Sequence, residues 1–407
     1  MLNLINKAKW LLSGNILFAF SQWLTLIFFA KLTSSQALGQ YAFALSITAP
    51  IFMLTNLQLR PLLITDYHGE KNYNFEDFFS LRFYSNFIAL FIVFFWGVIS
   101  NSETLLIIMI VAAIKFLEGI SDILYAYYNA ENKTKLITKS LTIKALGSLL
   151  SVFLILFLSK SVELGAFSIF IIYFLVLFFI DLKMIKPSLG WFKFNYLKIK
   201  KLAVYSLPLG VAVMLVSLQT NMPRYFIEKY QTIEDVGIFT VFYYFIVIGG
   251  IFINSICQYL SPYYASFWNQ GDIQKFWLYI KYSWSIAILF ALLSFIFVYF
   301  FGKYTISLIY GEVFIQHLFV LKLLIFSSLF VYLSVVNGYV LTSLNILKIQ
   351  VPMFLILILI SIISSWLLIP TYGLSGAAWV CCISAFFQFC ISSLVLFHKM
   401  RGSYVKT

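Results

Sequence analysis

The chain is a succession of long apolar segments separated by short polar ones. Cutting it at charges and at clusters of Pro, Gly and Asn leaves twelve segments long enough to span a membrane. The pattern therefore predicts an all-α integral membrane protein with about twelve transmembrane helices. Their approximate bounds are 11–31, 41–64, 83–100, 105–128, 143–159, 164–181, 203–225, 236–257, 281–301, 318–341, 350–369 and 374–397.

The longest basic connector, residues 183–201, divides these helices into two sets of six. We expect an N-terminal lobe at 1–182 and a C-terminal lobe at 202–407. Because each half holds an even number of helices, both halves share one orientation, and a pseudo-twofold axis would run along the membrane normal. The basic and aromatic residues of the connector are typical of an amphipathic helix on the cytoplasmic leaflet, although a simple loop remains an open interpretation.

The composition rules out a soluble domain, and it therefore changes how the net positive charge of the chain is interpreted. Of the 407 residues, 62% are hydrophobic and 11% are charged, and the mean hydropathy is +0.95. A net charge of +13 would suggest nucleic acid as the partner of a soluble protein. Here the basic residues lie between apolar runs, so lipid headgroups and topology explain them better, and no nucleic acid is expected. With a cytoplasmic N-terminus, most Lys and Arg fall on the cytoplasmic side, and both termini lie inside.

The predicted helix 105–128 carries three charges on one face. Lys115, Glu118 and Asp122 are spaced i, i+3 and i+7, within an arc of about 60°. Each charge near the bilayer centre costs about 2.5–3.5 kcal/mol on insertion scales, so the three must pair or line a wet cavity. Two interpretations stay open: an internal cluster that holds helices together, or a polar path used in transport.

Further ionisable and amide groups lie in three other predicted helices. Lys31, Arg60, Lys115 and Arg224 could together form a cationic cavity for an anionic headgroup, since Arg and Lys suit phosphate recognition. Alternatively, Arg60 and Arg224 could snorkel to opposite membrane surfaces. The same helices carry the polar residues Asn56, Asn221 and Glu228.

Signals for enzymatic or metal chemistry are missing from the sequence. All four cysteines lie in apolar segments, which implies no disulfide framework, and no His or Cys spacing suits a metal. There is no Walker A motif and no nucleophile elbow. We expect a protein that is not an enzyme, with no cofactor and no metal site.

Several stretches resemble one family, the Wzx-type O-antigen or polysaccharide repeat-unit flippases of the multidrug/oligosaccharidyl-lipid/polysaccharide (MOP) exporter superfamily. The resemblance is concentrated in the first 70 residues and in 217–240. The stretches that carry it are Gly14-Asn15, Ser21–Leu24, Ala30–Leu32, Leu38–Ala42, Ile47–Arg60, Asn221–Glu228 and Val236–Phe239.

The resemblance implies two six-helix lobes around a central cavity and transport by alternating access. The substrate would be an undecaprenyl-pyrophosphate-linked oligosaccharide, moved with ion coupling from the cytoplasmic to the periplasmic leaflet of the bacterial inner membrane. It makes Arg60, Lys115 and Arg224 candidate substrate contacts, with Lys31 at the outer mouth. Candidates for ion coupling or a polar path are Glu118, Asp122, Glu228, Asn56 and Asn221.

The resemblance also suggests membrane lipids, a polysaccharide polymerase and a chain-length regulator as partners. Two other functions remain open. A multidrug or cation antiporter of the same superfamily would have an acidic, aromatic cavity. A membrane polysaccharide polymerase or glycosyltransferase would have a large external loop, and the short predicted loops oppose it.

Overall fold

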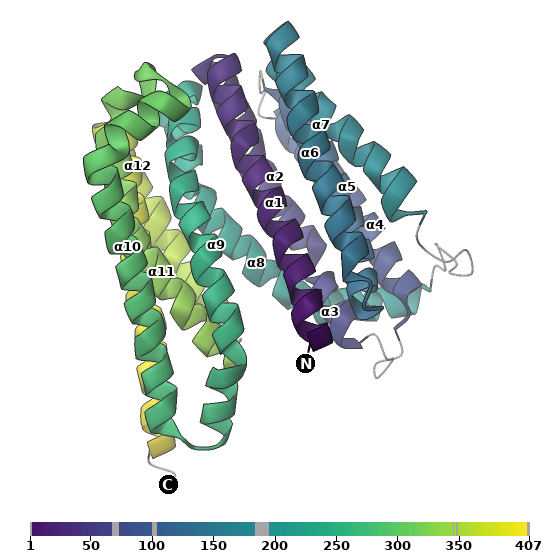
Figure 1. Ribbon diagram of the computed structural model, residues 1–407, viewed down its shortest axis with the longest axis vertical. Helices are drawn as coiled ribbons and strands as arrows, with labels where there is room; N and C mark the ends of the chain where they lie inside the picture. The colour runs from purple at the N-terminus through teal and green to yellow at the C-terminus, as the bar shows by residue number, and fades with distance from the viewer. Residues whose placement is uncertain are drawn as a thin grey trace. The chain divides into compact units, whose positions relative to one another are not determined.

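The computed structural model describes residues 2–66, 73–99, 104–183, 195–344, 346 and 349–404, and these residues form helices and turns without a strand. The chain divides into two compact units, Met1–Ser217 and Leu218–Thr407 (Figure 1). The all-α prediction is confirmed. The predicted lobes at 1–182 and 202–407 stay a prediction, as does the axis that would relate them. Residues 184–194, most of the predicted connector, lie outside the described residues.

The first unit is a bundle built around α5. Helix α5 (Leu105–Ala130) packs against α2 (Ser35–Asn56), α3 (Leu59–Asp66), α4 (Phe75–Ile99), α6 and α7. The unit also contains the N-terminal helix and a π-helical turn that follows α7. The remaining bounds are α1 (Leu2–Leu32), α6 (Thr134–Ser159), α7 (Val162–Val176) and η1 (Leu177–Asp181). Because α5 is surrounded on several sides, its charged face lies inside the protein.

The predicted helix 41–64 is broken into α2 and α3 at Leu57 and Gln58, which both adopt left-handed backbone conformations with φ of 51° and 50°. Pro61 explains the position of the break. A proline ring collides with the carbonyl of the residue four positions earlier, here Leu57, and proline has no N–H for the helical ladder. The Leu57 N–H instead bonds to the Leu54 carbonyl at 3.1 Å. Because of the break, Asn56 and Arg60 lie on two different helices rather than one turn apart on a single straight helix.

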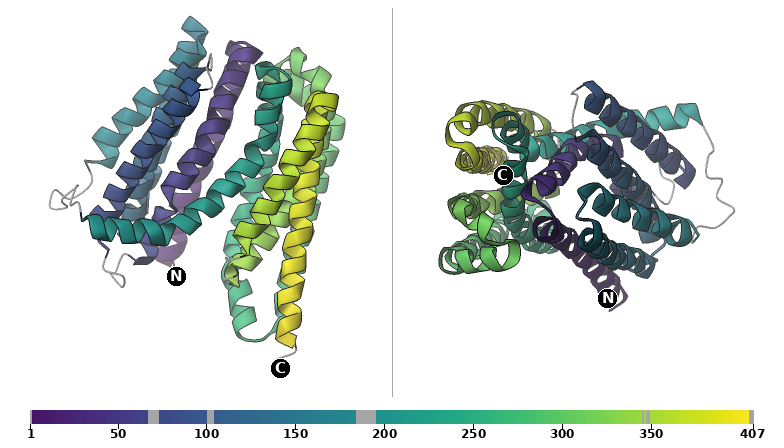
Figure 2. Two further views of the ribbon diagram at one scale, coloured as in Figure 1. Left: turned by 180° about the vertical axis from the view of Figure 1, so that it is seen from behind. Right: turned by 90° about the horizontal axis from the view of Figure 1, so that it is seen from above.

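The second unit is organised in the same way around one central helix. Helix α8 (Tyr196–Tyr230) begins in the first unit and ends in the second. Helix α11 (Leu318–Ser343) packs against α9 (Ile233–Asn269), α10 (Ile273–Tyr310) and α12 (Gln350–Tyr404) (Figure 2). A short 3-10 helix, η2 (Glu312–His317), precedes α11.

Short polar turns separate the helices, and side-chain caps fix several of their starts. Ser34, Ser161 and Asp272 each accept a hydrogen bond from a backbone N–H of the following first turn. Thr232 and Asp235 form a reciprocal capping box at the start of α9. These caps satisfy N–H groups that have no partner within the helix, so each chain reversal occupies only a few residues.

Within the described residues, ten helical segments are long and apolar enough to cross a membrane. Helix α5 is not among them because of its three charges, although its 26 residues suffice for a crossing. Helix α12 is interrupted at Gly373, with φ of 55° and ψ of −131°, and supplies two crossings. Adding α5 and dividing α12 brings the ten to the expected twelve.

Several of the predicted spans begin too late in the sequence, and two of them matter for the site. The segments predicted at 83–100 and 143–159 correspond to α4 and α6, which begin at Phe75 and Thr134. Arg82 and Lys144, which lie at the starts of these predicted spans, are therefore well inside helices. Both side chains are buried, and both belong to the candidate site.

Candidate functional site

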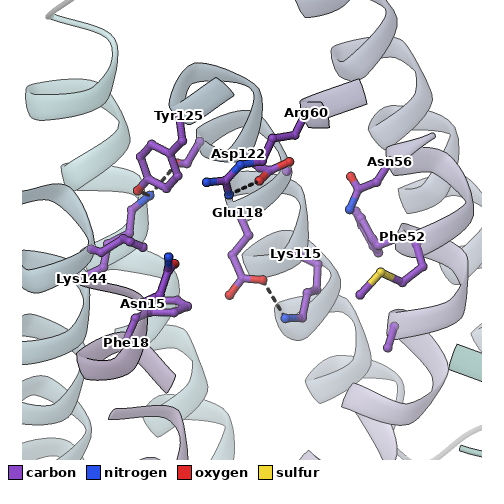
Figure 3. A pocket seen from close by; sticks show the side chains of 15 residues that line it. Asn15, Phe18, Phe52, Asn56, Arg60, Lys115, Glu118, Asp122, Tyr125 and Lys144 are labelled. Atoms are coloured by element: carbon purple, nitrogen blue, oxygen red, sulfur yellow. Dashed lines mark hydrogen bonds and ion pairs between the residues drawn. The ribbon is translucent and has the colours of Figure 1, made fainter. Parts of the chain in front are cut away.

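A polar cavity of about 270 Å³ lies within the first unit, beside the charged face of α5. Figure 3 shows Lys115 and Glu118 near its middle, with Lys144 and Tyr125 on one side and Asn56 on the other. Helices α1, α2, α3, α5 and α6 all contribute to its lining. The other lining residues are Asn15, Phe18, Ala49, Phe52, Met53, Arg60, Gly119, Ser121, Asp122 and Leu141.

Asp122 is shared by two arginines. Its Oδ1 accepts a hydrogen bond from Arg60 Nη1 at 2.9 Å, and its Oδ2 accepts one from Arg82 Nη2 at 3.3 Å. Arg82 Nη1 also donates to Asn56 Oδ1. The side chain of Arg82 is 1% exposed, whereas those of Arg60 and Asp122 are each 31% exposed. Arg82 thus anchors Asp122 from behind, while Arg60 reaches it from the open side of the cavity.

Lys115 and Glu118 form a second ion pair one turn away on α5. Lys115 Nζ lies 2.6 Å from Glu118 Oε2, and both side chains are 24% exposed (Figure 3). Partial exposure inside a membrane-spanning bundle means that this pair faces the cavity rather than a dry helix contact. The predicted common face of Lys115, Glu118 and Asp122 is therefore present in the structure, and all three residues line the cavity.

Lys144 closes the cavity from α6 and belongs to a drier network. Its Nζ donates to Asp181 Oδ2 at 3.0 Å, to Ser121 Oγ at 2.5 Å and to Tyr125 Oη at 3.0 Å. The side chains of Lys144 and Asp181 are 3% and 1% exposed. Tyr128 donates to the Asp181 backbone carbonyl and so fixes the π-helical turn that presents the carboxylate.

The cavity lining carries more positive than negative charge. Arg60, Lys115 and Lys144 face it, against the carboxylates of Glu118 and Asp122. Including Arg82 and Asp181, which lie behind the wall, leaves the same excess of one positive charge. The arrangement is chemically suited to hold an anion, because an incoming phosphate can replace a carboxylate as the partner of Arg60 or Lys115.

The cavity brings together five of the residues singled out in the sequence, and four others lie elsewhere. Arg60, Lys115, Glu118, Asp122 and Asn56 line the cavity, with Arg60 bonded to Asp122 rather than extended toward a helix end. Lys31 is exposed in the last turn of α1 and is not part of the lining. Asn221, Arg224 and Glu228 lie on α8 within the second unit. The shared cationic cavity of Lys31, Arg60, Lys115 and Arg224 remains a prediction.

Arg224 is buried in the second unit, where hydrogen bonds and aromatic rings surround its guanidinium. The residue is 5% exposed, and its Nε donates to Thr240 Oγ1 at 2.9 Å while Nη1 donates to Asn221 Oδ1 at 2.9 Å. Its guanidinium lies 5.6 Å from the Phe239 ring centroid and 5.0 Å from that of Tyr243. Among the described residues no carboxylate lies within 4.0 Å of it, so hydrogen bonds and aromatic faces hold this cation.

Arg82 and Lys144 are the site residues that sequence reasoning missed. Cutting apolar segments at charges placed both residues at the ends of spans. A signal was present for Lys144, because the segment 143–159 is unusually short for a crossing. Extending that segment toward Thr134 would have placed Lys144 inside the membrane, where an ionisable residue indicates function.

Comparison with known proteins gives the chain a family. Residues 4–268 match the family described as polysaccharide biosynthesis protein. The capsular polysaccharide biosynthesis protein CapF of Staphylococcus aureus is 28% identical over 387 residues, which cover 94% of this chain and 96% of CapF.

Solved structures share the fold at low sequence identity. An inward-facing multidrug resistance MATE transporter of the MOP superfamily has a TM-score of 0.77 and 13% identity, with 96% of this chain and 95% of that one covered. A MOP superfamily transporter from Pyrococcus furiosus, described as having a binding pocket of reversed polarity, has a TM-score of 0.65 and 13% identity, with 100% and 96% covered. Together with the helical fold, these matches show that the chain belongs to the polysaccharide biosynthesis protein family, as a multi-pass membrane protein with the MOP transporter fold.

Proposed function

We propose that the protein moves undecaprenyl-pyrophosphate-linked oligosaccharide repeat units from the cytoplasmic to the periplasmic leaflet of the bacterial inner membrane, with both termini cytoplasmic. The observation that carries this proposal is the convergence of Arg60, Lys115 and Lys144 on one cavity inside a membrane-spanning bundle. A pyrophosphate cannot enter hydrocarbon unaided, and guanidinium and ammonium groups are the side chains best suited to bind it.

The basic residues of the cavity exchange a carboxylate partner for the phosphate of the substrate. This exchange explains how their charges stay paired when no substrate is bound. In the empty cavity, Asp122 neutralises Arg60 and Glu118 neutralises Lys115. An arriving pyrophosphate takes over Arg60, and Asp122 keeps its hydrogen bond to Arg82. Breaking a buried pair outright costs about 3–5 kcal/mol, so exchange is far less costly than separation.

Ion coupling follows from the same carboxylates. A coupling ion that binds Glu118 or Asp122 changes the net charge of the cavity and therefore the strength with which Lys115 and Arg60 hold a phosphate. Glu118 and Asp122 are therefore the proposed coupling groups, and Asn56, which accepts a hydrogen bond from Arg82, belongs to the same polar path.

The antiporter alternative has less support. A cation exporter requires carboxylates that are available to a positively charged substrate. In the cavity, Glu118 and Asp122 are each bonded to a basic side chain, at 2.6 Å and 2.9 Å respectively. The basic residues outnumber the acids, which favours an anionic passenger.

Complementation of a strain that lacks its repeat-unit flippase tests the proposal. We expect Arg60→Ala, Lys115→Ala and Arg224→Ala each to lower surface polysaccharide by at least about tenfold and to accumulate lipid-linked intermediates, because charge-assisted hydrogen bonds contribute about 1.5–3 kcal/mol. Arg60→Lys should retain part of the activity. Lys275→Ala removes an exposed lysine paired with Asp272 and serves as the matched control. Wild-type assembly in all three alanine variants, at normal protein levels, would refute the proposal.

A further inference from the structure

The hairpin of α9 and α10 in the second unit is longer than a bilayer crossing. The helices have 37 and 38 residues, about 55 Å each, against about 30 Å of hydrocarbon. At least one end must therefore reach the lipid headgroups. Near the turn at Gln270–Asp272, aromatic residues with polar atoms gather, including Trp268 and Trp277. Such residues concentrate at the membrane–water interface, which places this end of the hairpin at headgroup level.

A pocket of about 580 Å³ opens at this end between α10 and α12. Gln274, Trp277 and Lys281 are spaced i, i+3 and i+7 on α10 and line it from one helical face. Phe397 on α12 lines the opposite side, and its ring centroid lies 5.3 Å from that of Trp277. Trp284 forms an apolar wall, because its indole N–H is already donated to Asn337 at 3.0 Å.

The floor of the pocket is firmly packed. Beneath it, buried side chains of α9, α10, α11 and α12 form one hydrophobic cluster, and Trp277 and Trp284 pack against that cluster. Tyr264, Phe276 and Leu396 in this cluster have no exposed surface. The pocket is therefore a fixed feature of the helix bundle rather than a gap between loose side chains.

Lys281 is the charged group of this pocket, and no carboxylate lines the pocket beside it. Among the described residues, no acidic side chain lies within 4.0 Å of the Lys281 ammonium. Lys275 on the same helix differs, because its Nζ lies 2.8 Å from the carboxylate of Asp272. The positive charge of Lys281 is thus available to a ligand, while that of Lys275 is already neutralised.

We propose that this pocket binds the headgroup of an anionic membrane phospholipid. The Lys281 ammonium holds the phosphodiester, and the Gln274 amide and the Trp277 indole N–H supply further donors. The acyl chains lie along Leu278 and the faces of Trp284 and Phe397. Basic pockets between transmembrane helices at headgroup level are suited to such lipids. This inference does not depend on the proposed transport activity.

Lipid binding to the purified full-length protein tests the proposal. The protein in detergent is titrated with phosphatidylglycerol or with phosphatidylcholine, and retained lipid is counted by native mass spectrometry. We expect preferential retention of phosphatidylglycerol by the wild type, about fivefold weaker retention by Lys281→Gln, and wild-type retention by Lys281→Arg. Lys275→Gln makes the same change in net charge on the same helix and should retain phosphatidylglycerol like the wild type.

Other outcomes would overturn the proposal. Equal retention of the two lipids would remove the role of the anionic headgroup. An equal loss in Lys281→Gln and Lys275→Gln would indicate a general charge effect rather than this pocket. Full competition by millimolar inorganic phosphate would identify a free-anion site in place of a lipid site.

Discussion

At the scale of single residues, ionised side chains can lie inside the membrane-spanning bundle of the first unit because each basic residue of the site is paired with a carboxylate. The sequence predicted the face formed by Lys115, Glu118 and Asp122, since helical periodicity depends only on spacing. It did not predict Arg82 and Lys144, because a charge beside an apolar run looks the same at a membrane surface and inside a bundle. Their carboxylate partners come from α5 and η1, and no local pattern reveals such long-range pairs.

Arg82 is expected to be a stability residue of the site. Arg82→Met leaves Asp122 without its buried partner and Asn56 without a donor. Asp122 keeps Arg60 as its ionic partner, so we expect a loss of about 1–3 kcal/mol, seen as a lower midpoint of thermal unfolding in detergent. Lys133→Ala, which removes an exposed pair with Glu131, should change stability by no more than about 1 kcal/mol. Equal midpoints in both variants would show that the Arg82 network contributes no stability.

For the Lys144–Asp181 pair, we expect the destabilisation caused by one substitution to be reversed by a second. Lys144→Met removes the cation and leaves the Asp181 carboxylate, 1% exposed, without its ionic partner. We expect a loss of about 3–5 kcal/mol, larger than that of Arg82→Met, seen as a fall in the unfolding midpoint. Adding Asp181→Asn removes the orphaned charge and should recover most of the loss. A double variant less stable than Lys144→Met alone would contradict this account.

At the scale of elements, long apolar runs identify membrane-spanning helices reliably, whereas the ends and breaks of those helices are harder to predict from sequence. The sequence located all the crossings because apolar length alone identifies them. It placed the starts of α4 and α6 too late, and it took 41–64 as one helix although Pro61 breaks it. The turn predicted at 370–373 is present as the interruption at Gly373.

The interruption of α12 requires a small residue just after it. A Cβ at Gly376 would collide with the backbone carbonyl oxygen of Leu368, and backbone cannot move away as a side chain can. We expect Gly376→Ala to lower stability by about 1–3 kcal/mol or to reduce the folded yield in size-exclusion chromatography. Gly338→Ala on α11 is the matched control, because nothing lies within 4 Å of its Cβ position. Equal behaviour of the two variants would refute the close packing at Gly376.

At the scale of the whole molecule, each unit surrounds one central helix, α5 or α11, yet these two helices differ. Helix α5 carries an ionised face, whereas α11 has Asn337 as a buried polar residue, bonded to Ser392 and Ser393. The two units therefore share an architecture but differ in the polar residues on their central helices. The packing of α1, α2, α3, α5 and α6 around the cavity of the first unit could not be derived from spacing, because hydrophobic periodicity describes each helix separately.

The orientation of the chain is testable with single cysteines in its turns. A cytoplasmic N-terminus places Gln270 on the cytoplasmic side and Ser159 on the outer side, and both residues are exposed. We expect an impermeant thiol reagent applied to intact spheroplasts to label Ser159→Cys but not Gln270→Cys, with the opposite result in inside-out vesicles. The wild type, with its four native cysteines, sets the background. A reversed labelling pattern would invert the topology.

Movement of a lipid-linked substrate across a reconstituted membrane tests the central claim most directly, namely that the cationic cavity beside α5 carries an anionic headgroup. Proteoliposomes would contain the wild type, Arg60→Ala or the control Lys275→Ala, and the fraction of polyprenyl-pyrophosphate oligosaccharide reaching the opposite leaflet would be measured. We predict movement by the wild type and the control, and at least a tenfold slower rate for Arg60→Ala. Equal rates for all three proteins would contradict the account.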